Sequence, residues 1–189
     1  MSKKKLPPQT LLIPLPVVMV SCQSKDKPNI ITLAWAGVVC SEPPMVGVGI
    51  RPSRYSFGII KESREFVVNI VNESLIQQAD FCGSHSGKDV DKFKKLNLTP
   101  IRGEKLKTPL IKESPINLEC QVKKIIELGT HHLFLGEVVA THIDEEYLDA
   151  EGNPDIAKLK PIVYCTKAHQ YWGGLSKVLG TYGYTAKRK

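Results

Sequence analysis

The sequence lacks the cysteine patterns that stabilise small secreted domains or bind zinc. Its five cysteines are Cys22, Cys40, Cys82, Cys120 and Cys165. Their number is odd, and no two stand at the two-residue spacing of metal-binding motifs, so neither a disulfide framework nor a zinc site is predicted. The first eight residues carry charge but no apolar core or cleavage site, so no signal peptide is predicted. We expect reduced thiols and a cytoplasmic protein.

Long apolar runs and hydrolytic motifs are also missing. The longest run, 11–20, is far shorter than the ~20 residues that a membrane span needs, so no membrane partner is expected. No HExxH or GxSxG motif occurs, and His131 and His132 alternate across a predicted strand, so they cannot both bind one ion. Neither a metal site nor hydrolase chemistry is indicated.

The positive charge is concentrated at the two ends of the chain. The net charge is +7, from 26 basic and 19 acidic residues. Six of the basic residues lie within 3–5 and 187–189, and the rest nearly balance the acidic ones. A nucleic-acid surface would carry its basic excess on the folded body. We therefore expect no nucleic-acid partner, and we expect flexible basic ends at 1–8 and 185–189.

The 189 residues suggest one domain against a prior of ~150 residues per domain. Alternating and β-branched patterns predict strands at 17–22, 30–39, 45–50, 66–71, 116–127, 132–143 and 161–165. Helices are predicted after Ser53 as the N-cap, at 74–81 and at 89–96. Gly47 and Gly49 leave one strand face bare, which marks either a bulge or the close approach of another group. The pattern favours a mostly β fold, a barrel with inserted helices, over βαβ winding.

The segment 51–56 combines a strand end, a proline, two arginines and two serines at a predicted helix start. Unpaired N–H groups, the positive end of the helix dipole and guanidinium groups together suit a phosphate monoester. The alternative is a capped surface helix with exposed arginines.

Two further segments have the composition of ligand-binding loops. The loop 82–88 has small residues, hydroxyls and a lysine before a helix, which suits an anion, although a plain helix–helix loop is the alternative. It lacks the spacing of a nucleotide-binding P-loop. The segment 32–41 places small residues around Trp35, which suits the edge of a planar ring or, alternatively, a core strand with one large aromatic.

In their order along the chain, these segments resemble a known family. The resemblance rests on the stretches 29–37, 41–44, 51–56, 65–69, 79–83, 86–87, 91–93, 118–120, 136–139 and 179–183. The chain resembles the flavin reductase-like, FMN-binding split-barrel proteins, specifically the flavoredoxin branch, over nearly its whole length. The resemblance implies a Greek-key split β-barrel and a homodimer with one FMN per subunit near the dimer interface.

The resemblance also implies a set of cofactor-binding residues. Arg51, Ser53, Arg54 and Ser56, beside Tyr55, are expected to bind the phosphate of FMN. The loop residues Cys82, Gly83, Ser86, Gly87 and Lys88 are expected to close over that phosphate. The edge of the flavin ring is expected to contact Ala34, Trp35, Ala36, Gly37, Val39, Cys40 and Ser41. Phe93 and Trp172 are expected to flank the ring.

One departure concerns the electron donor. Many NAD(P)H-dependent members carry a Gly-Asp-His motif on the late strand, where this chain reads Gly136-Glu137-Val138. The sequence therefore leaves open NAD(P)H or an electron-transfer protein as donor. We expect an FMN-dependent oxidoreductase that passes electrons to a flavin, a metal complex or a protein. The alternatives are a non-enzymatic FMN carrier and a scaffold without cofactor.

Overall fold

The computed structural model describes residues 2–25, 27–175 and 177–185. Seven antiparallel strands form its main sheet in the order β3-β2-β6-β9-β10-β5-β4. These strands are β2 (Val18–Ser24), β3 (Lys27–Leu33), β4 (Ala36–Ser41), β5 (Pro44–Ile50), β6 (Glu65–Ile70), β9 (Ile116–Leu128) and β10 (His131–Ile143). The pairs β2/β3, β4/β5 and β9/β10 are hairpins, and β6 lies between β2 and β9.

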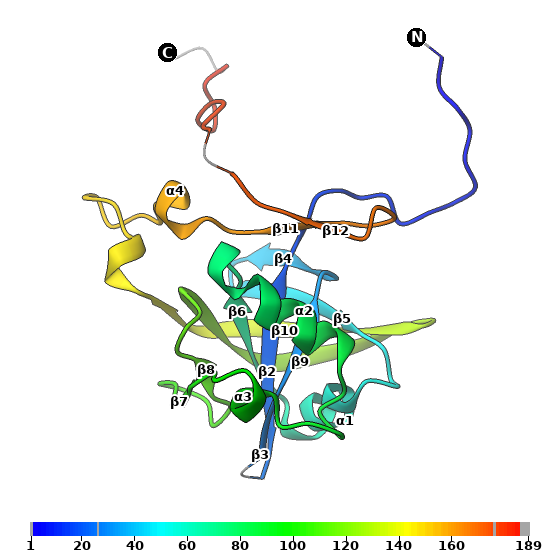
Figure 1. The fold of residues 1–189 in the computed structure, drawn as a ribbon, viewed down its shortest axis with the longest axis vertical. Helices are drawn as coiled ribbons and strands as arrows, with labels where there is room; N and C mark the ends of the chain where they lie inside the picture. The colour runs from blue at the N-terminus through cyan, green and yellow to red at the C-terminus, as the bar shows by residue number, and fades with distance from the viewer. Residues whose placement is uncertain (1, 26, 176, 186–189) are drawn as a thin grey trace.

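Side-chain alternation along the strands makes two cores. On β2, Val18 and Val20 point into the main core with Phe66 and Phe134, which are fully buried. Met19, from the opposite face of β2, packs in a second core beneath the helices. Helix α1 (Tyr55–Ser63) packs Phe57, Ile59 and Ile60 into the first core, and α2 (Ile76–Ser84) and α3 (Lys92–Lys95) cover the second. This arrangement confirms the predicted β-barrel with inserted helices (Figure 1).

A second, three-stranded sheet lies across one end of the barrel. It joins β1 (Leu15–Pro16), β11 (Val163–Cys165) and β12 (Gln170–Trp172) in the order β1-β11-β12, and both chain termini extend beyond it on the same side (Figure 1). The remaining elements are β7 (Pro100–Ile101), β8 (Leu110–Ile111), α4 (Ile156–Leu159) and the 3-10 turns η1 (Glu73–Leu75) and η2 (Glu145–Tyr147). Among the described residues, no helix is long and apolar enough to cross a membrane.

Three sequence predictions are corrected by the structure. The expected strand 30–39 is two strands, because the chain bends at Ala34 and Trp35 between β3 and β4. The N-cap of α1 is Arg54 and not Ser53, since the helix begins one residue later than predicted. The helix expected at 89–96 is only the short α3, capped by the Asp91 carboxylate, which accepts from the Lys94 N–H. Of the ends predicted to be basic and flexible, 1–8 and 185–189, residues Met1 and 186–189 lie outside the described residues.

The bare glycine face of β5 marks a close approach rather than a bulge in that strand. A Cβ atom on Gly49 would lie 3.2 Å from Cβ of Trp35, and one on Gly47 would lie 3.2 Å from Val39 Cγ1. The Gly49 N–H also donates to the Trp35 carbonyl at 2.7 Å. The two glycines therefore let the 35–39 segment lie directly on β5.

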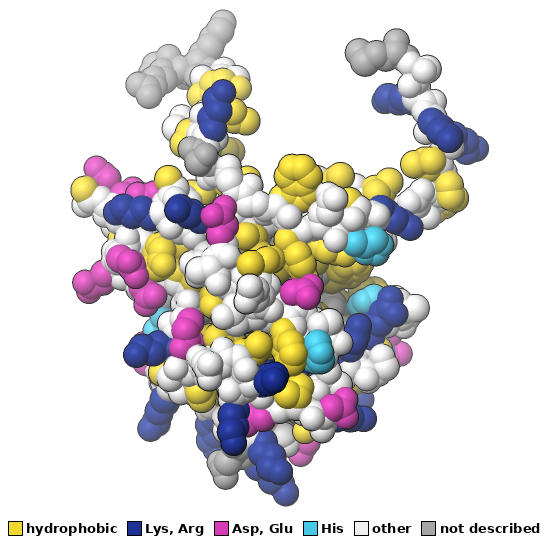
Figure 2. Space-filling model, in the orientation of Figure 1, with side chains coloured by type: hydrophobic (Ala, Val, Ile, Leu, Met, Phe, Trp, Pro, Cys, Tyr) yellow, Lys and Arg dark blue, Asp and Glu magenta, His cyan; other side chains and the backbone are white. Residues whose placement is uncertain are grey.

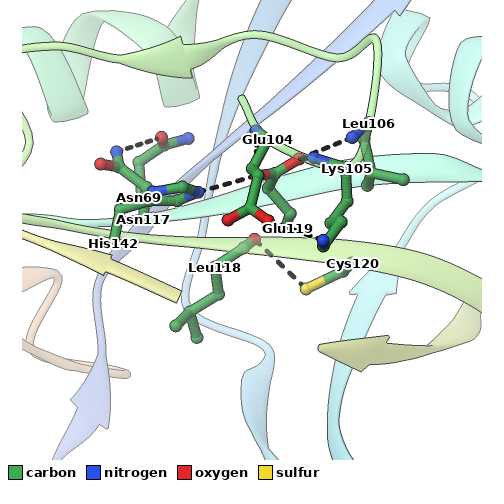
Figure 3. A network of polar contacts seen from close by, with 9 residues as sticks. All are labelled: Asn69, Glu104, Lys105, Leu106, Asn117, Leu118, Glu119, Cys120 and His142. Carbon is green, nitrogen blue, oxygen red and sulfur yellow. Dashed lines mark hydrogen bonds and ion pairs between the residues drawn. The ribbon is translucent and has the colours of Figure 1, made fainter. Parts of the chain in front are cut away.

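A buried carboxylate joins the barrel to the loop that precedes β8 (Figure 3). Glu119 on β9 is fully buried and accepts from the backbone N–H groups of Glu104, Lys105 and Leu106 at 2.7–3.0 Å. His142 Nε2 lies 2.7 Å from its Oε1. Burial alone would raise the pKa of Glu119, but these four hydrogen bonds outweigh burial and hold the pKa below its ordinary value. The charged form is therefore part of the folded structure.

Candidate functional site

Three neighbouring hollows run along one side of the barrel. The main cavity, of about 410 Å³, lies between the end of β3, the start of α1, helix α2 and the β11–β12 hairpin. A small pocket of about 100 Å³ adjoins it and shares Ile31, Arg54 and Gly83 with it. An apolar cleft of about 450 Å³ adjoins the other end and shares Ala34, Trp35, Gly49 and His131.

The small pocket brings together the two segments that the sequence singled out for anion binding. From the α1 start it is lined by Ser53, Arg54, Tyr55 and Ser56, and from the 82–88 loop by Cys82, Gly83, Ser86 and Gly87. These segments are some thirty residues apart in the chain, and packing of α1 and α2 against the sheet places them face to face. Among the described residues that line it, none is Asp or Glu.

Asn29 on β3 fixes the geometry of this pocket. Its Nδ2 donates to Ser56 Oγ at 2.8 Å, and both side chains are buried. A Cβ atom on Gly87 would lie 2.0 Å from Asn29 Oδ1 and 2.9 Å from Tyr55 Cδ1, so only glycine fits there. The loop can approach the start of α1 because position 87 carries no side chain.

Lys92 is a buried cation at the same pocket. The side chain is 3% exposed, and its Nζ donates to the carbonyls of Ile30 at 2.7 Å and Cys82 at 2.8 Å. Burial, and to a lesser extent the nearby Arg54 guanidinium, lower the pKa of Lys92. Two cationic side chains thus converge on a pocket without a carboxylate, which is an arrangement that an anion would stabilise.

The main cavity has a mixed lining. Thr32 contributes a buried Oγ1 that has no hydrogen-bond partner within the described residues. Tyr164 and Tyr171 cover the cavity from the β11–β12 hairpin, with ring centroids 5.4 Å apart. The Tyr171 hydroxyl donates to Asp80 Oδ1 at 3.2 Å, and burial together with the Asp80 charge raises the pKa of Tyr171 to about 12. Tyr171 is therefore a neutral hydrogen-bonding group at neutral pH.

Trp35 and His131 form the boundary between the main cavity and the apolar cleft. Their rings are parallel within 6°, with centroids 5.9 Å apart. Arg51 Nε donates to His131 Nε2 at 3.4 Å, and burial together with the charges of Arg51 and Arg54 lowers the pKa of His131. The imidazole is therefore neutral at neutral pH.

Five of the predicted site residues line none of these hollows. Cys40, Ser41 and Lys88 lie outside them, and Cys40 Sγ donates to the Glu42 carbonyl at 3.3 Å. Phe93 is 4% exposed in the second core, because the apolar side of α3 packs on the sheet. Trp172 points away, because alternate residues of β12 face opposite sides and Tyr171 takes the inward position.

The structure also adds residues that were not among the predicted site residues, although Thr32 and His85 lie within the segments 32–41 and 82–88 that the sequence singled out. Asn29, Thr32, His85, Lys92, Tyr164, Tyr171 and His131 all line the main cavity or the small pocket. Asn29 and Lys92 stand within the motif stretches 29–37 and 91–93, but nothing local separates Lys92 from the exposed Lys94 and Lys95. Of the remaining predicted residues, Arg51 lines the main cavity, and Ala36, Gly37 and Val39 line the apolar cleft.

Fold and comparison together identify the class of protein. A split β-barrel carries the three hollows, and the sequence model of the flavin reductase-like domain matches residues 10–173. The chain superposes on the flavoredoxin of Desulfovibrio vulgaris (Miyazaki F) with a TM-score of 0.91 and 32% identity, covering 97% of this chain and all of that one. The flavoredoxin of Methanosarcina acetivorans gives a TM-score of 0.91 and 34% identity, covering 99% and 98%.

A curated relative agrees with this assignment. An uncharacterized protein of Archaeoglobus fulgidus is 40% identical over 131 residues, which cover 69% of this chain and 73% of that protein. The chain belongs to the flavin reductase-like family. Within it, the chain is of the flavoredoxin branch.

Proposed function

We propose that the protein is an FMN-dependent oxidoreductase whose small pocket holds the phosphate of FMN. The observation that carries this is the convergence of Arg54 and Lys92, with the hydroxyls of Ser53 and Ser86, on a pocket of about 100 Å³. A phosphate monoester is a dianion of that size class, and charge-assisted hydrogen bonds to it are the strong kind. The start of α1 adds unpaired backbone N–H groups at the same place.

The residues of the main cavity fit the rest of the cofactor. The partnerless Thr32 Oγ1 supplies a buried hydrogen-bonding group in the cavity beside the phosphate pocket, where a ribityl hydroxyl or a ring edge can satisfy it. Ala34 and Trp35 border this cavity with little side-chain bulk except the indole, and Tyr164 and Tyr171 offer aromatic faces from above. We infer that the flavin ring lies between these two walls.

The protein's part in the chemistry is binding, orientation and exclusion of water. Bound FMN would supply the electron-accepting and electron-donating ring. The Tyr171–Asp80 hydrogen bond holds the β12 wall against α2, and the neutral His131 with Arg51 closes the far end. No acid–base residue is required for this role. The five cysteines are free thiols, which supports a reducing, cytoplasmic location.

The rates at which different electron donors reduce the bound flavin distinguish a reductase from a carrier. In place of the Gly-Asp-His motif, Glu137 forms an ion pair with Lys123 at 2.7 Å. We therefore expect NADH and NADPH to bleach the FMN-loaded protein slowly, and a reduced ferredoxin-type protein to bleach it rapidly. Anaerobic stopped-flow absorbance measures both rates. Failure to bind FMN at all would overturn the proposal, whereas FMN binding with no transfer from any donor to any acceptor would favour the non-enzymatic carrier.

We further propose a homodimer, formed through apolar surface that one chain leaves uncovered. Figure 2 shows hydrophobic side chains gathered around the end of the molecule where the termini emerge. Val38 on the edge strand β4 is 80% exposed, and Val178 and Leu179 are 82% and 86% exposed. Exposed apolar surface of this kind is typical of protein interfaces.

The assembly is measurable directly. We expect light scattering at micromolar protein to give twice the mass of the 21.0 kDa chain. The mass should fall towards that of one chain when residues 175–189 are removed. A monomer with full FMN occupancy would contradict the dimer and leave the cofactor proposal standing.

A further inference from the structure

We propose that the apolar cleft binds the second substrate of the flavin site, and that this substrate is an uncharged, planar carbonyl compound of the quinone class. The proposal rests on the proposed FMN site, because the cleft opens into the cavity assigned to the flavin ring. It names the chemistry of the electron acceptor, which the family assignment leaves open.

The cleft has the shape and lining of a small-molecule site. Its volume of about 450 Å³ falls in the ~300–1,000 Å³ range of ligand pockets. Leu11, Leu12 and Leu15 line it from the segment that precedes β2, and Val39, Leu128 and Leu133 line it from β4, β9 and β10. This lining offers dispersion contacts and little hydrogen bonding.

The lack of charged groups in the lining of the cleft disfavours anionic substrates. Among the described residues that line it, none is Lys, Arg, Asp or Glu. The one titratable group among the described lining residues is His131, whose ring is neutral at neutral pH for the reasons given above. A nicotinamide dinucleotide would bring a pyrophosphate, which needs cationic or N–H partners that this lining does not offer. A neutral ring system brings no charge that would have to lose its hydration on entering the cleft.

The cleft and the cavity assigned to the flavin ring form one continuous space. They share Trp35 and His131, whose stacked rings stand at the junction, together with Ala34 and Gly49. A planar molecule in the cleft can therefore lie against Trp35 and reach the flavin. Bound reduced FMN would supply the two electrons and two protons that convert a quinone there into the hydroquinone, and would itself return to the oxidised form.

Edge strand β4 separates this cleft from the proposed dimer surface. Val39 lines the cleft, and a Cβ atom on Gly47 would lie 3.2 Å from its Cγ1. The neighbouring Val38 pairs with Val46 of β5 and does not line the cleft. Both valines are at least half exposed, so neither is needed for the core. This gives a matched pair of variants, Val39→Asp and Val38→Asp.

The experiment measures binding through Trp35 fluorescence. The chain has two tryptophans, and the other, Trp172, is 57% exposed and lines none of the three hollows. In a Trp172→Phe background, 2,3-dimethyl-1,4-naphthoquinone should quench Trp35 saturably, in both the FMN-loaded and the cofactor-free chain. 2-Hydroxy-3-methyl-1,4-naphthoquinone has nearly the same shape but is an anion at neutral pH, and it should bind at least about tenfold more weakly. Neither compound has a free quinone ring position for thiol addition.

The variants decide whether the quenching comes from the cleft. Val39→Asp should weaken binding of the uncharged quinone by about tenfold or more, because a carboxylate would have to be desolvated against it. Val38→Asp should leave that affinity unchanged. Equal affinity for the anion, equal effects of the two variants, or absence of saturable quenching would overturn the proposal. So would a cleft filled by a second copy, seen as loss of the dimer in Val39→Asp with no quinone binding in the parent chain.

The same samples separate this inference from the cofactor proposal. FMN affinity is read in each variant from quenching of flavin fluorescence. Normal FMN affinity without quinone binding would overturn only the acceptor site. Absence of FMN binding would overturn the cofactor proposal, whatever the quinone does at Trp35.

Discussion

We expect Arg54→Ala to bind FMN ten- to a hundredfold more weakly than the parent chain and to bind riboflavin almost unchanged. Arg54 lines both the small pocket and the main cavity, so its guanidinium can reach a phosphate in the former. A hydrogen bond to a charged group contributes about 1.5–3 kcal/mol, and ~1.4 kcal/mol is a factor of ten in affinity. Riboflavin lacks the phosphate, so its affinity should not change when the arginine is removed. Fluorescence titration of both ligands measures the difference.

Lys92 and Arg102 complete this test. Lys92→Met should reduce the advantage of FMN over riboflavin by a similar factor, because its Nζ is at the same pocket. Melting curves should accompany it, since Lys92 also bonds the carbonyls of Ile30 and Cys82. Arg102→Ala is the control on an exposed residue outside the site. Equal losses of FMN and riboflavin in Arg54→Ala would show that the arginine is structural and would move the phosphate site elsewhere.

We expect Glu119→Ala to destabilise the fold by about 3–5 kcal/mol, because it leaves one partner of a buried polar cluster uncompensated. Three backbone N–H groups of the 104–106 loop and the His142 ring would lose their acceptor inside the protein. For a chain of this length each kcal/mol lowers Tm by about 2–4 °C. Thermal unfolding by circular dichroism measures the shift.

Glu113→Ala is the matched control for this change. The Glu113 carboxylate also accepts from a backbone N–H, that of Thr99, but the side chain is exposed. Its loss should cost no more than about 1 kcal/mol. Similar Tm shifts for the two variants would mean that the Glu119 cluster contributes no more than a surface contact.

The same carboxylate predicts how stability responds to acid. Because the pKa of Glu119 in the folded chain lies below its ordinary value of 4.5, its contribution is complete above that pH and is lost as the pH falls through the folded pKa. Denaturant unfolding of the parent chain should therefore lose stability below about pH 4.5, and Glu119→Ala should lose less over the same interval. An identical pH dependence in both chains would contradict this assignment.

Much of the fold was readable from local pattern. Alternating apolar residues predicted five of the seven main strands close to their observed bounds. The other two, β3 and β4, were misread as the single run 30–39, because the bend at Ala34 and Trp35 has no Gly or Pro to mark it. The segments 51–56 and 82–88 were singled out by composition, and the structure places residues of both around one pocket, Lys88 excepted. The composition of these segments and their order along the chain were enough to single them out.

Which neighbouring residue faces the site was decided only by the tertiary structure. Lys92 enters the pocket while Lys94 and Lys95 stay in solvent, because α3 is a single turn whose orientation is set by Phe93 in the core. Tyr171 rather than Trp172 covers the cavity, because pairing of β12 with β11 fixes which side each residue faces. The sequence by itself determined most of the strands, the family and the two segments that we propose to bind an anion. The inward faces depend on contacts between residues far apart in the chain, which no local pattern encodes.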